Sequence, residues 1–364
     1  MGIIKWGFPL GWTYGSMPNT PRGPTRIRAT PIPILLFCLT PALADDGTGN
    51  ETCDTDLLSV PECVLDEDVL LPDLMTVVPK HVQIQNSQQR EMLRFSNGIA
   101  NVGLGPWWLE PEFPDAASGV ACQGAWQVIT GPEHFANRQL LSDGYTIPAP
   151  EGTYRHRCQK GSFDFHESHN HWHVDNIGEF KVCSATDFAS DGSNCDPAVT
   201  TSGAPTVGVK YTFCLIDWYK LADNTASSDD TRNFFECSSG MQGITPGWVD
   251  QYHQATDGQE VDVTGIPAGS YVLVSSVNGG ALAGDPLYEE SDTSNNTSYL
   301  RFDLQRDSRG NPRVRNESGA CEDPEFLAAL QATVAEFAAL WEGGSASFAT
   351  NMVEDMCGGK PANR

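Results

Sequence analysis

Short β-type runs dominate the middle of the chain. Between residues 70 and 304, runs of β-branched and aromatic residues such as 92–95, 211–216 and 270–277 are separated by Gly, Pro, Asn and Asp. Short runs bounded by turn residues are typical of an antiparallel sandwich or barrel. This region has no long stretch with the 3.6-residue period of a helix. The pattern therefore predicts an all-β fold, an antiparallel β-sandwich, over residues 70–304.

The pattern changes after residue 305. Asp323 and Pro324 are the cap and first-turn residues typical of a helix start, and apolar residues then recur at helical spacing as far as Trp341. We expect residues 305–364 to form a short C-terminal extension with one helix. Docking of its apolar face on the β domain is favoured over binding of a partner. That face contains Phe326, Leu327, Leu330, Val334, Phe337 and Leu340.

A secretory signal is predicted near the start of the chain. Arg26 and Arg28 precede an apolar run over residues 31–44 that ends in a small-x-small triplet. No later stretch approaches the roughly 20 apolar residues that a membrane helix needs. We therefore expect a signal peptide over residues 1–44, a cysteine-containing segment over 45–69, and a secreted protein without a membrane anchor. A start codon assigned too early would explain the residues that precede the signal.

Charge narrows the classes of partner. The chain has 47 Asp and Glu against 22 Lys and Arg, which gives a net charge of -25. A surface of this sign repels the phosphate backbone of nucleic acid and attracts cations. We therefore expect no nucleic-acid partner and favour cationic ones.

The cysteine count agrees with export. The chain has 11 cysteines, and removal of Cys38 with the signal leaves an even number. An even set in an exported chain predicts disulfides formed in an oxidising compartment. Proximity along the chain predicts the pairs Cys53–Cys63, Cys183–Cys195, Cys214–Cys237 and Cys321–Cys357, which leaves Cys122 for Cys158.

Histidines cluster in one short segment. Five of the eight lie within residues 156–173, and His169, His171 and His173 alternate with other residues. On a strand these three imidazoles face the same side while Trp172 faces the other. Three neutral imidazoles suit copper or zinc and leave coordination positions open for water or substrate. The spacing predicts a catalytic metal site; a surface tract or a structural zinc site is the alternative.

Three motifs follow one another along the chain. Residues 169–180 join the alternating histidines to an acidic, Phe-containing run, residues 208–217 carry a lysine, and residues 242–252 end near a tyrosine. In this order they resemble the copper-binding, lysine-bearing and tyrosine-bearing segments of the lysyl oxidase family. The resemblance covers about residues 70–304 and rests on several ordered motifs. One departure is Ser168, where animal members of the family have a cysteine.

The resemblance implies a cofactor and a reaction. Lys210 and Tyr252 occupy the positions that cross-link into lysine tyrosylquinone, beside copper held by the three histidines. Such a cofactor oxidises primary amines or peptidyl lysine to aldehydes, with dioxygen as the oxidant and ammonia and hydrogen peroxide as products. A proton acceptor is required, and Asp250 and Asp217 are candidates that the sequence does not separate, with His253 as a third.

A second metal site is expected at an acidic turn. Residues 290–296 supply four carboxylate or amide side chains, and hard oxygen donors in a loop are what calcium takes. The resemblance adds Asp73 and the backbone carbonyl of Leu74, and it implies a structural calcium site. The alternative is a solvated acidic turn. The four side chains are Glu290, Asp292, Asn295 and Asn296.

Two other functions remain open on the same residues. One is a non-catalytic, exported β-sandwich that binds metal or calcium. The other is a zinc-dependent hydrolase on the three histidines, which would hydrolyse its substrate without consuming oxygen. Peroxide release on addition of a primary amine separates the amine oxidase from both.

Overall fold

The chain divides at Ala44 into two units, and every residue described below belongs to the second, Asp45–Arg364. The predicted signal peptide lies outside the described residues. A computed structural model describes residues 63–111, 122–131, 154–166, 171–175, 177–186, 188–189, 194–208, 213–222, 233–238, 241–279, 286–340 and 346–358.

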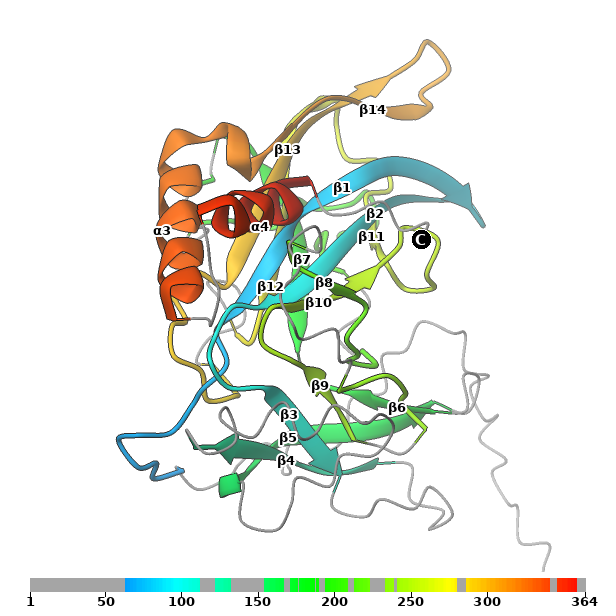
Figure 1. Ribbon diagram of the computed structural model, residues 1–364. Helices are drawn as coiled ribbons and strands as arrows, with labels where there is room; N and C mark the ends of the chain where they lie inside the picture. The colour runs from blue at the N-terminus through cyan, green and yellow to red at the C-terminus, as the bar shows by residue number, and fades with distance from the viewer. Residues whose placement is uncertain are drawn as a thin grey trace, which may run out of the picture. The chain divides into compact units, whose positions relative to one another are not determined.

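The described strands form three antiparallel sheets (Figure 1). The first contains β1 (Leu74–Ser87), β2 (Arg90–Asn101), β10 (Trp248–Tyr252) and β8 (Tyr219–Lys220), with β11 (Glu260–Asp262) paired to β2. The second contains β14 (Pro312–Gly319), β13 (Thr297–Arg306), β12 (Gly269–Val277) and β7 (Gly178–Ser184). The third contains β6 (His171–Val174), β5 (Tyr154–His166), β4 (Cys122–Thr130), β3 (Trp107–Pro111) and β9 (Gln242–Ile244). The expectation of an all-β antiparallel fold with disulfides is confirmed.

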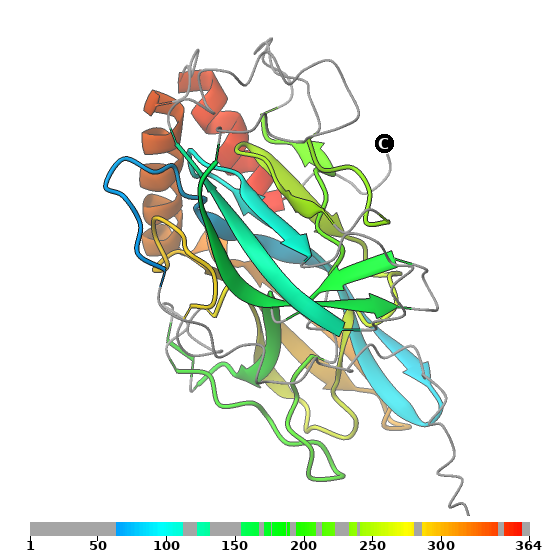
Figure 2. The same ribbon diagram turned by 90° about the horizontal axis from the view of Figure 1, so that it is seen from below.

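The sheets share one apolar core. In the first sheet, β1 packs against β12 and β13 of the second, so the two sheets face each other. Figure 2 shows the strands of the third sheet lying side by side. Phe163 and Trp172 of this third sheet belong to the same apolar cluster as Phe95 and Leu93 of β2. Burial of these large side chains, each worth about 1.5–3 kcal/mol, fixes the three sheets together.

The C-terminal region contains more structure than the sequence predicted. Strand β14 pairs with β13, and a short 3-10 turn η4 (Ala320–Glu322) leads into α3 (Pro324–Leu340) and then α4 (Ala346–Gly358). The prediction of a single helix was therefore wrong. Asp323 does cap α3, since its Oδ1 accepts the backbone N–H of Glu325 at 2.9 Å. The described residues contain no helix long and apolar enough to cross a membrane.

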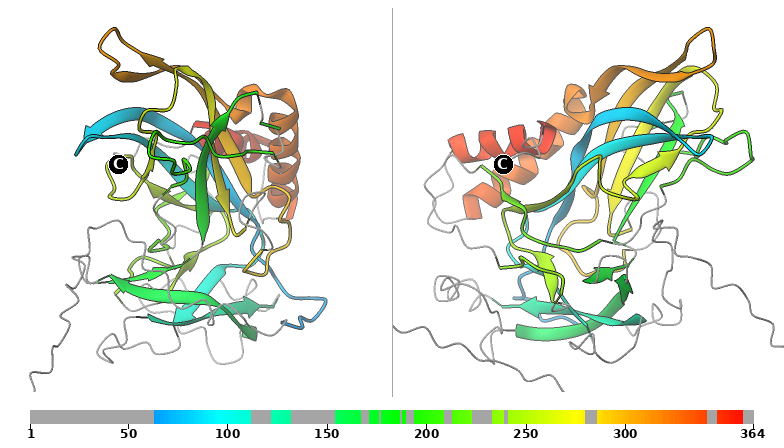
Figure 3. Two further views of the ribbon diagram at one scale, coloured as in Figure 1. Left: turned by 180° about the vertical axis from the view of Figure 1, so that it is seen from behind. Right: turned by 90° about the vertical axis from the view of Figure 1, so that its right-hand side faces the viewer.

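Both helices pack on the first sheet, beside β1 (Figure 3). Leu330, Val334 and Phe337 of α3 are buried there, as predicted, while Leu340 is 55% exposed and was wrongly assigned to the buried face. Helix α4 completes the cluster with Phe348, Met352 and Met356. These three residues are four apart, which places them on one face of the helix.

Four disulfides join described residues, and two of the five predicted pairs are wrong. Cys63 bonds to Cys158 and not to Cys53, so the predicted Cys122–Cys158 pair also fails. Cys53 and the side chain of Cys122 lie outside the described residues. The confirmed pairs are Cys183–Cys195, Cys214–Cys237 and Cys321–Cys357.

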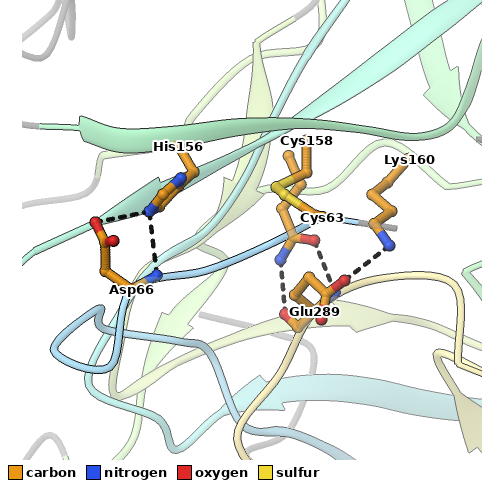
Figure 4. The surroundings of a disulfide bond; sticks show 7 residues. Cys63, Asp66, His156, Cys158, Lys160 and Glu289 are labelled. Atoms are coloured by element: carbon orange, nitrogen blue, oxygen red, sulfur yellow. Dashed lines mark hydrogen bonds and ion pairs between the residues drawn. A yellow bond between two sulfur atoms is a disulfide. The ribbon is translucent and has the colours of Figure 1, made fainter. Parts of the chain in front are cut away.

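Long-range contacts explain the Cys63–Cys158 pair (Figure 4). The residues after Cys63 run beside β5, where Asp66 Oδ2 lies 3.1 Å from His156 Nε2. Two residues beyond Cys158, Lys160 forms an ion pair with Glu289 at 2.8 Å. Cys63 and its partner are thus 95 positions apart in the sequence. A prediction based on proximity along the chain cannot find such a pair.

A buried carboxylate organises the segment around the Cys214–Cys237 disulfide. Asp217 accepts the backbone N–H groups of Asn233, Phe234 and Thr245, and also the Thr245 hydroxyl, at 2.7–3.1 Å. Burial raises the pKa of Asp217 from 3.8 to about 6, although these hydrogen bonds act in the opposite direction. This carboxylate holds three separate pieces of backbone together.

We predict that loss of this disulfide weakens the fold. The bridge closes a loop with a sequence separation of 23. A loop of this length corresponds to roughly 3 kcal/mol of stabilisation through restriction of the unfolded chain. The double substitution Cys214→Ser and Cys237→Ser should lower the free energy of unfolding by about that amount in urea denaturation. An unchanged unfolding midpoint would contradict this.

A pH dependence is predicted for Asp217. Its pKa is higher in the folded protein than its ordinary value, so the folded state retains a proton that the unfolded chain has released between pH 3.8 and about 6. This contribution to stability is fully present below pH 3.8 and is lost as the pH rises through about 6. Asp217→Asn should lower stability by about 1–3 kcal/mol, because its amide faces N–H donors. Its unfolding free energy should also fall less steeply than that of the wild type across this window, and equal slopes would refute the expectation.

Candidate active site

Strand β6 presents two histidines to one side. Trp172 is fully buried, with its ring edge-on to Phe165 at 5.2 Å between centroids. Because side chains alternate along a strand, His171 and His173 face the opposite side. Their Nε2 atoms lie 3.0 Å apart, and His173 is only 2% exposed. The predicted alternation therefore brings two imidazole nitrogens together.

The separation of these nitrogens fits a shared metal ion. Two nitrogens each about 2.0–2.1 Å from one ion lie about 2.8–3.4 Å apart at angles of about 90–109°. The same distance is a hydrogen bond when one nitrogen carries a proton. His169, the third predicted ligand, lies outside the described residues. Among the side chains that the structure describes, no three His, Cys, Asp or Glu converge as a metal site.

Strand β10 places Asp250 and Tyr252 on one face, since they are two residues apart. The Tyr252 hydroxyl donates to the backbone carbonyl of Cys214 at 2.5 Å. Its ring packs edge-on against Phe213 with the centroids 4.7 Å apart. Burial, followed by the negative charge of Asp250, holds the pKa of Tyr252 well above its usual value. Tyr252 is thus neutral and fixed in place.

One cavity of about 450 Å³ connects these two strands. The histidines of β6, the carboxylate-bearing Asp250 and Tyr252 all contribute to its wall. Trp218, which the sequence analysis did not single out, lies at the cavity although it is 47% exposed. No local pattern identifies such a residue, because its role depends on which strands surround it. The lining residues are His171, His173, Cys214, Ile216, Trp218, Asp250, Gln251, Tyr252, His253 and Thr256.

The candidate proton acceptors differ in their surroundings. Asp217 is completely buried, accepts four hydrogen bonds and is not among the cavity residues. His253 lines the cavity, but its Nδ1 accepts the backbone N–H of Ala255 at 3.1 Å. In the neutral ring the proton is then on Nε2, and Nδ1 already serves as a hydrogen-bond acceptor. Asp250 lines the cavity as an acceptor-only carboxylate.

Lys210 lies outside the described residues. The first described residue after it is Phe213, whose ring contacts Tyr252 and whose backbone pairs with Val174 of β6. The chain that carries Lys210 thus continues directly into a contact with both strands of the site.

The two strands are linked through the segments joined by the Cys214–Cys237 disulfide. The backbone carbonyl of Cys237 accepts the N–H of Trp172 at 3.2 Å, while that of Cys214 accepts the Tyr252 hydroxyl. The fully buried side chain of Gln242 adds a second link. Its Nε2 donates to the Trp172 carbonyl at 2.5 Å, and its Oε1 accepts the N–H of Leu215 at 2.9 Å. The histidine and tyrosine strands are therefore held in a defined relation.

The predicted calcium residues meet at the start of β1. Glu290 Oε2 accepts the N–H of Leu74 at 2.9 Å, and its Oε1 accepts the amide of Asn296 at 2.6 Å. Asn295 donates its amide to Asp73 Oδ1 at 2.8 Å. The beginning and the end of the domain, more than 200 residues apart, thus share one polar cluster.

Unsatisfied oxygens in this cluster fit a hard cation. The Oδ1 atoms of Asn295 and Asn296 are buried without a hydrogen-bond partner. Burial raises the pKa of Asp73 to about 6 and that of Glu290 to about 7, because negative charge there lacks solvent. Carboxylate and amide oxygens without compensation are the donors that calcium prefers. Asp292 is also close enough to contribute to the raised pKa of Asp73.

Comparison with known proteins identifies relatives of this chain. The family model "Lysyl oxidase" matches residues 121–309, just over half of the chain. "Lysyl oxidase homolog 2" of Rattus norvegicus is 28% identical over 184 residues, which cover 50% of this chain and 20% of that protein. "Protein-lysine 6-oxidase" is 29% identical over 136 residues in Sus scrofa, covering 37% of this chain and 44% of that protein.

The aligned part thus spans less than half the length of these relatives. The matched region nevertheless contains β6, β10 and the residues of both predicted metal sites except those at the start of β1. Strand β10 pairs with β2, so the strands that precede the matched region complete the same fold. On these grounds the chain belongs to the lysyl oxidase family.

Proposed function

We propose that this protein is a secreted, copper-dependent amine oxidase that converts primary amines or peptidyl lysine to aldehydes. The observation that carries the proposal is one cavity lined by two converging histidine nitrogens, Tyr252 and Asp250. Family membership supports amine oxidase chemistry on these residues. Because the match covers only part of these relatives, the substrate is also a proposal.

His169, His171 and His173 would hold copper, and Lys210 and Tyr252 would form lysine tyrosylquinone. When formed, this cofactor supplies an electrophilic carbonyl for a primary amine and a route for its electrons to dioxygen. The hydrogen bond from the Tyr252 hydroxyl to Cys214 and the Phe213 contact restrict rotation of the ring. The protein's contribution is to hold the tyrosine beside the histidines before oxidation begins.

Asp250 is the proposed general base. It lies on the same face of β10 as Tyr252 and lines the cavity, whereas Asp217 is enclosed by its four donors. His253 is the weaker candidate, because its Nδ1 is occupied by the Ala255 N–H. A carboxylate next to the cavity would also attract an ammonium group and then accept a proton from the carbon beside it.

The cavity wall offers a place for the substrate stem. Ile216 and Trp218 are apolar or aromatic, and an indole face attracts cations as well as hydrocarbon. The net charge of -25 favours the approach of cationic amines at low salt. Peptidyl lysine and free alkylamines both have this combination of ammonium group and apolar stem.

We further propose that calcium binds the cluster of Asp73, Leu74 and residues 290–296 in a structural role. The unpartnered amide oxygens of Asn295 and Asn296 support this. A cation there would join the first strand to the loop before β13. The four disulfides support export to an oxidising compartment, the location expected from the predicted signal.

The cofactor is tested by peptide mass spectrometry of copper-loaded, aerobically purified protein. We expect a peptide in which Lys210 and Tyr252 are covalently joined, with the mass change of quinone formation. Separate, unmodified peptides at full copper occupancy would rule out the quinone mechanism and favour a metal-binding module.

Removal of the Tyr252 hydroxyl should abolish turnover without loss of metal. Tyr252→Phe should reduce amine-dependent peroxide release to background, because phenylalanine lacks the oxygen from which the quinone starts. Copper content, measured by atomic absorption, should be unchanged. The control is Tyr271→Phe, which removes a hydroxyl bonded to the Pro267 carbonyl away from the cavity. Peroxide release by Tyr252→Phe at the wild-type rate would eliminate the proposal.

Calcium should stabilise the protein. A ligand that binds only the folded state at 100 times its Kd adds about 2.7 kcal/mol, so Tm should rise when calcium is added to chelator-treated protein. Glu290→Gln should remove most of this rise, since it deletes one negative charge from the cluster. An equal rise with magnesium, or none with calcium, would argue against a calcium site.

A further inference from the structure

A half-exposed tryptophan lies at the mouth of the candidate active site. Trp218 lines the cavity and is 47% exposed, whereas His173 and Asp250, which line the same cavity, are each 2% exposed. The cavity thus has a buried polar end and an aromatic side chain at its solvent-facing end. The face of an indole attracts an ammonium group, and its area covers hydrocarbon. The position of Trp218 therefore affects how well the cavity holds an amine.

The strand that follows Trp218 is too short to fix its position alone. Strand β8 is two residues long and lies at the edge of the described sheet, where it pairs with β10. Two backbone hydrogen bonds flank this pairing: Trp218 N–H donates to the Val249 carbonyl and Leu221 N–H to the Gly247 carbonyl, each at 2.9 Å. A two-residue edge strand has little stability of its own. Its position therefore depends on what holds its two ends.

A carboxylate holds each end of β8. Before the strand, Asp217 accepts its four hydrogen bonds. After the strand, Asp355 of helix α4 accepts the backbone N–H of Ala222 at 2.8 Å. Ala222 is 2% exposed and has a φ of 54°, in the left-handed region that alanine disfavours, so its surroundings must hold it there. Asp217 lies in the region matched by the family model, whereas Asp355 belongs to the extension beyond it.

The helix itself gives no reason for Asp355. Helix α4 ends at Gly358, so Asp355 lies in its last turn, where the helix dipole disfavours negative charge. The contact with the end of β8 compensates for this. Helix α4 is also well anchored, because Cys357 is bonded to Cys321 and Lys80 Nζ donates to the Gly358 carbonyl at 2.6 Å. Asp355 is thus presented to β8 from a fixed support.

The helix pair also packs against the back of the cavity wall. Tyr219 of β8 and Val249 of β10 belong to the apolar cluster formed with α3 and α4. Their neighbours in sequence, Trp218 and Asp250, line the cavity. This is the alternation of side chains expected for strands with one face toward the cavity and the other toward the helices. The extension therefore supports the part of the wall that carries Trp218.

We propose that Asp355 is a positioning residue, which holds the end of β8 so that Trp218 is correctly placed to bind an amine. The inference rests on the proposed amine oxidase function and gives the C-terminal extension a part in substrate binding. Asp355 acts through Trp218 and does not touch the substrate. Its loss should therefore weaken amine binding while the chemical step, which involves Tyr252 and Asp250, is unchanged.

The test is steady-state peroxide release by the copper-loaded full chain with n-butylamine. Asp355→Ala should raise KM about three- to tenfold, the effect of one hydrogen bond, with kcat unchanged to within about twofold. Asp355→Asn should behave as the wild type does, because its side-chain oxygen still accepts the Ala222 N–H. Glu354→Gln is the matched control, since it removes a charge from the exposed neighbouring position on α4. If Asp355→Ala does not fold, Asp355→Ser takes its place, because its side chain is polar but shorter.

A double-mutant cycle tests whether Asp355 acts through Trp218. Trp218→Ala should raise KM at least as much as Asp355→Ala does, because the whole indole is lost. Adding Asp355→Ala to Trp218→Ala should then change KM by less than about twofold, since no indole is left to position. Effects that simply multiply would show a general loosening of the fold and would overturn the proposal.

Hydrogen exchange gives a readout that needs no turnover. In the resting protein, the peptide that contains residues 218–222 should exchange faster in Asp355→Ala than in the wild type, Asp355→Asn or Glu354→Gln. Equal exchange in all four proteins would contradict the anchoring role.

The outcomes separate this inference from the proposed function. If the wild type releases no peroxide with n-butylamine, the proposed function fails and the inference fails with it. If the wild type is active and Asp355→Ala has the KM of Glu354→Gln, the inference alone is refuted. If Asp355→Asn is as impaired as Asp355→Ala, the effect comes from the negative charge and not from the hydrogen bond to Ala222, and the assignment is wrong.

Discussion

The site depends on a clamp between two strands that belong to different sheets. Strand β6 carries the histidines and β10 carries Tyr252, and the backbone carbonyls of Cys237 and Cys214 bond to one strand each. The disulfide between these cysteines makes the clamp covalent. The proposed metal and quinone would need a fixed separation, which this covalent link between the two strands helps to maintain.

Desolvated negative charge is the second constraint. The chain has a net charge of -25, and several carboxyl groups lie in buried clusters where their pKa values are raised. Asp217 is compensated by four donors, whereas Asp73 and Glu290 accept hydrogen bonds from amide groups, and the charge of Asp73 raises the pKa of Glu290. The hydrogen bonds that Asp217 accepts all come from groups of the protein. The cluster around Asp73 and Glu290 has amide oxygens without a hydrogen-bond donor, which is why a cation is proposed there and not at Asp217.

Local features were predictable to different degrees. The alternation around Trp172 predicted that His171 and His173 share a face, and the Asp323 cap predicted the start of α3. Helix α4 was missed although Phe348, Met352 and Met356 have helical spacing, because the segment is short and rich in polar residues. The position of Trp218 beside the cavity had no local signal.

By itself, the sequence determined the all-β class, the family, and the strand alternation that places His171 and His173 on one face, and it supplied the residue types of both proposed metal sites. These depend on short periodic patterns and on motifs read in order along the chain. The tertiary structure alone decided that Cys63 bonds to Cys158 and that Asp250 and not Asp217 faces the cavity. The physical reason is that each depends on which distant strands lie side by side, and sheet order is set by burial of a shared core that no local pattern encodes.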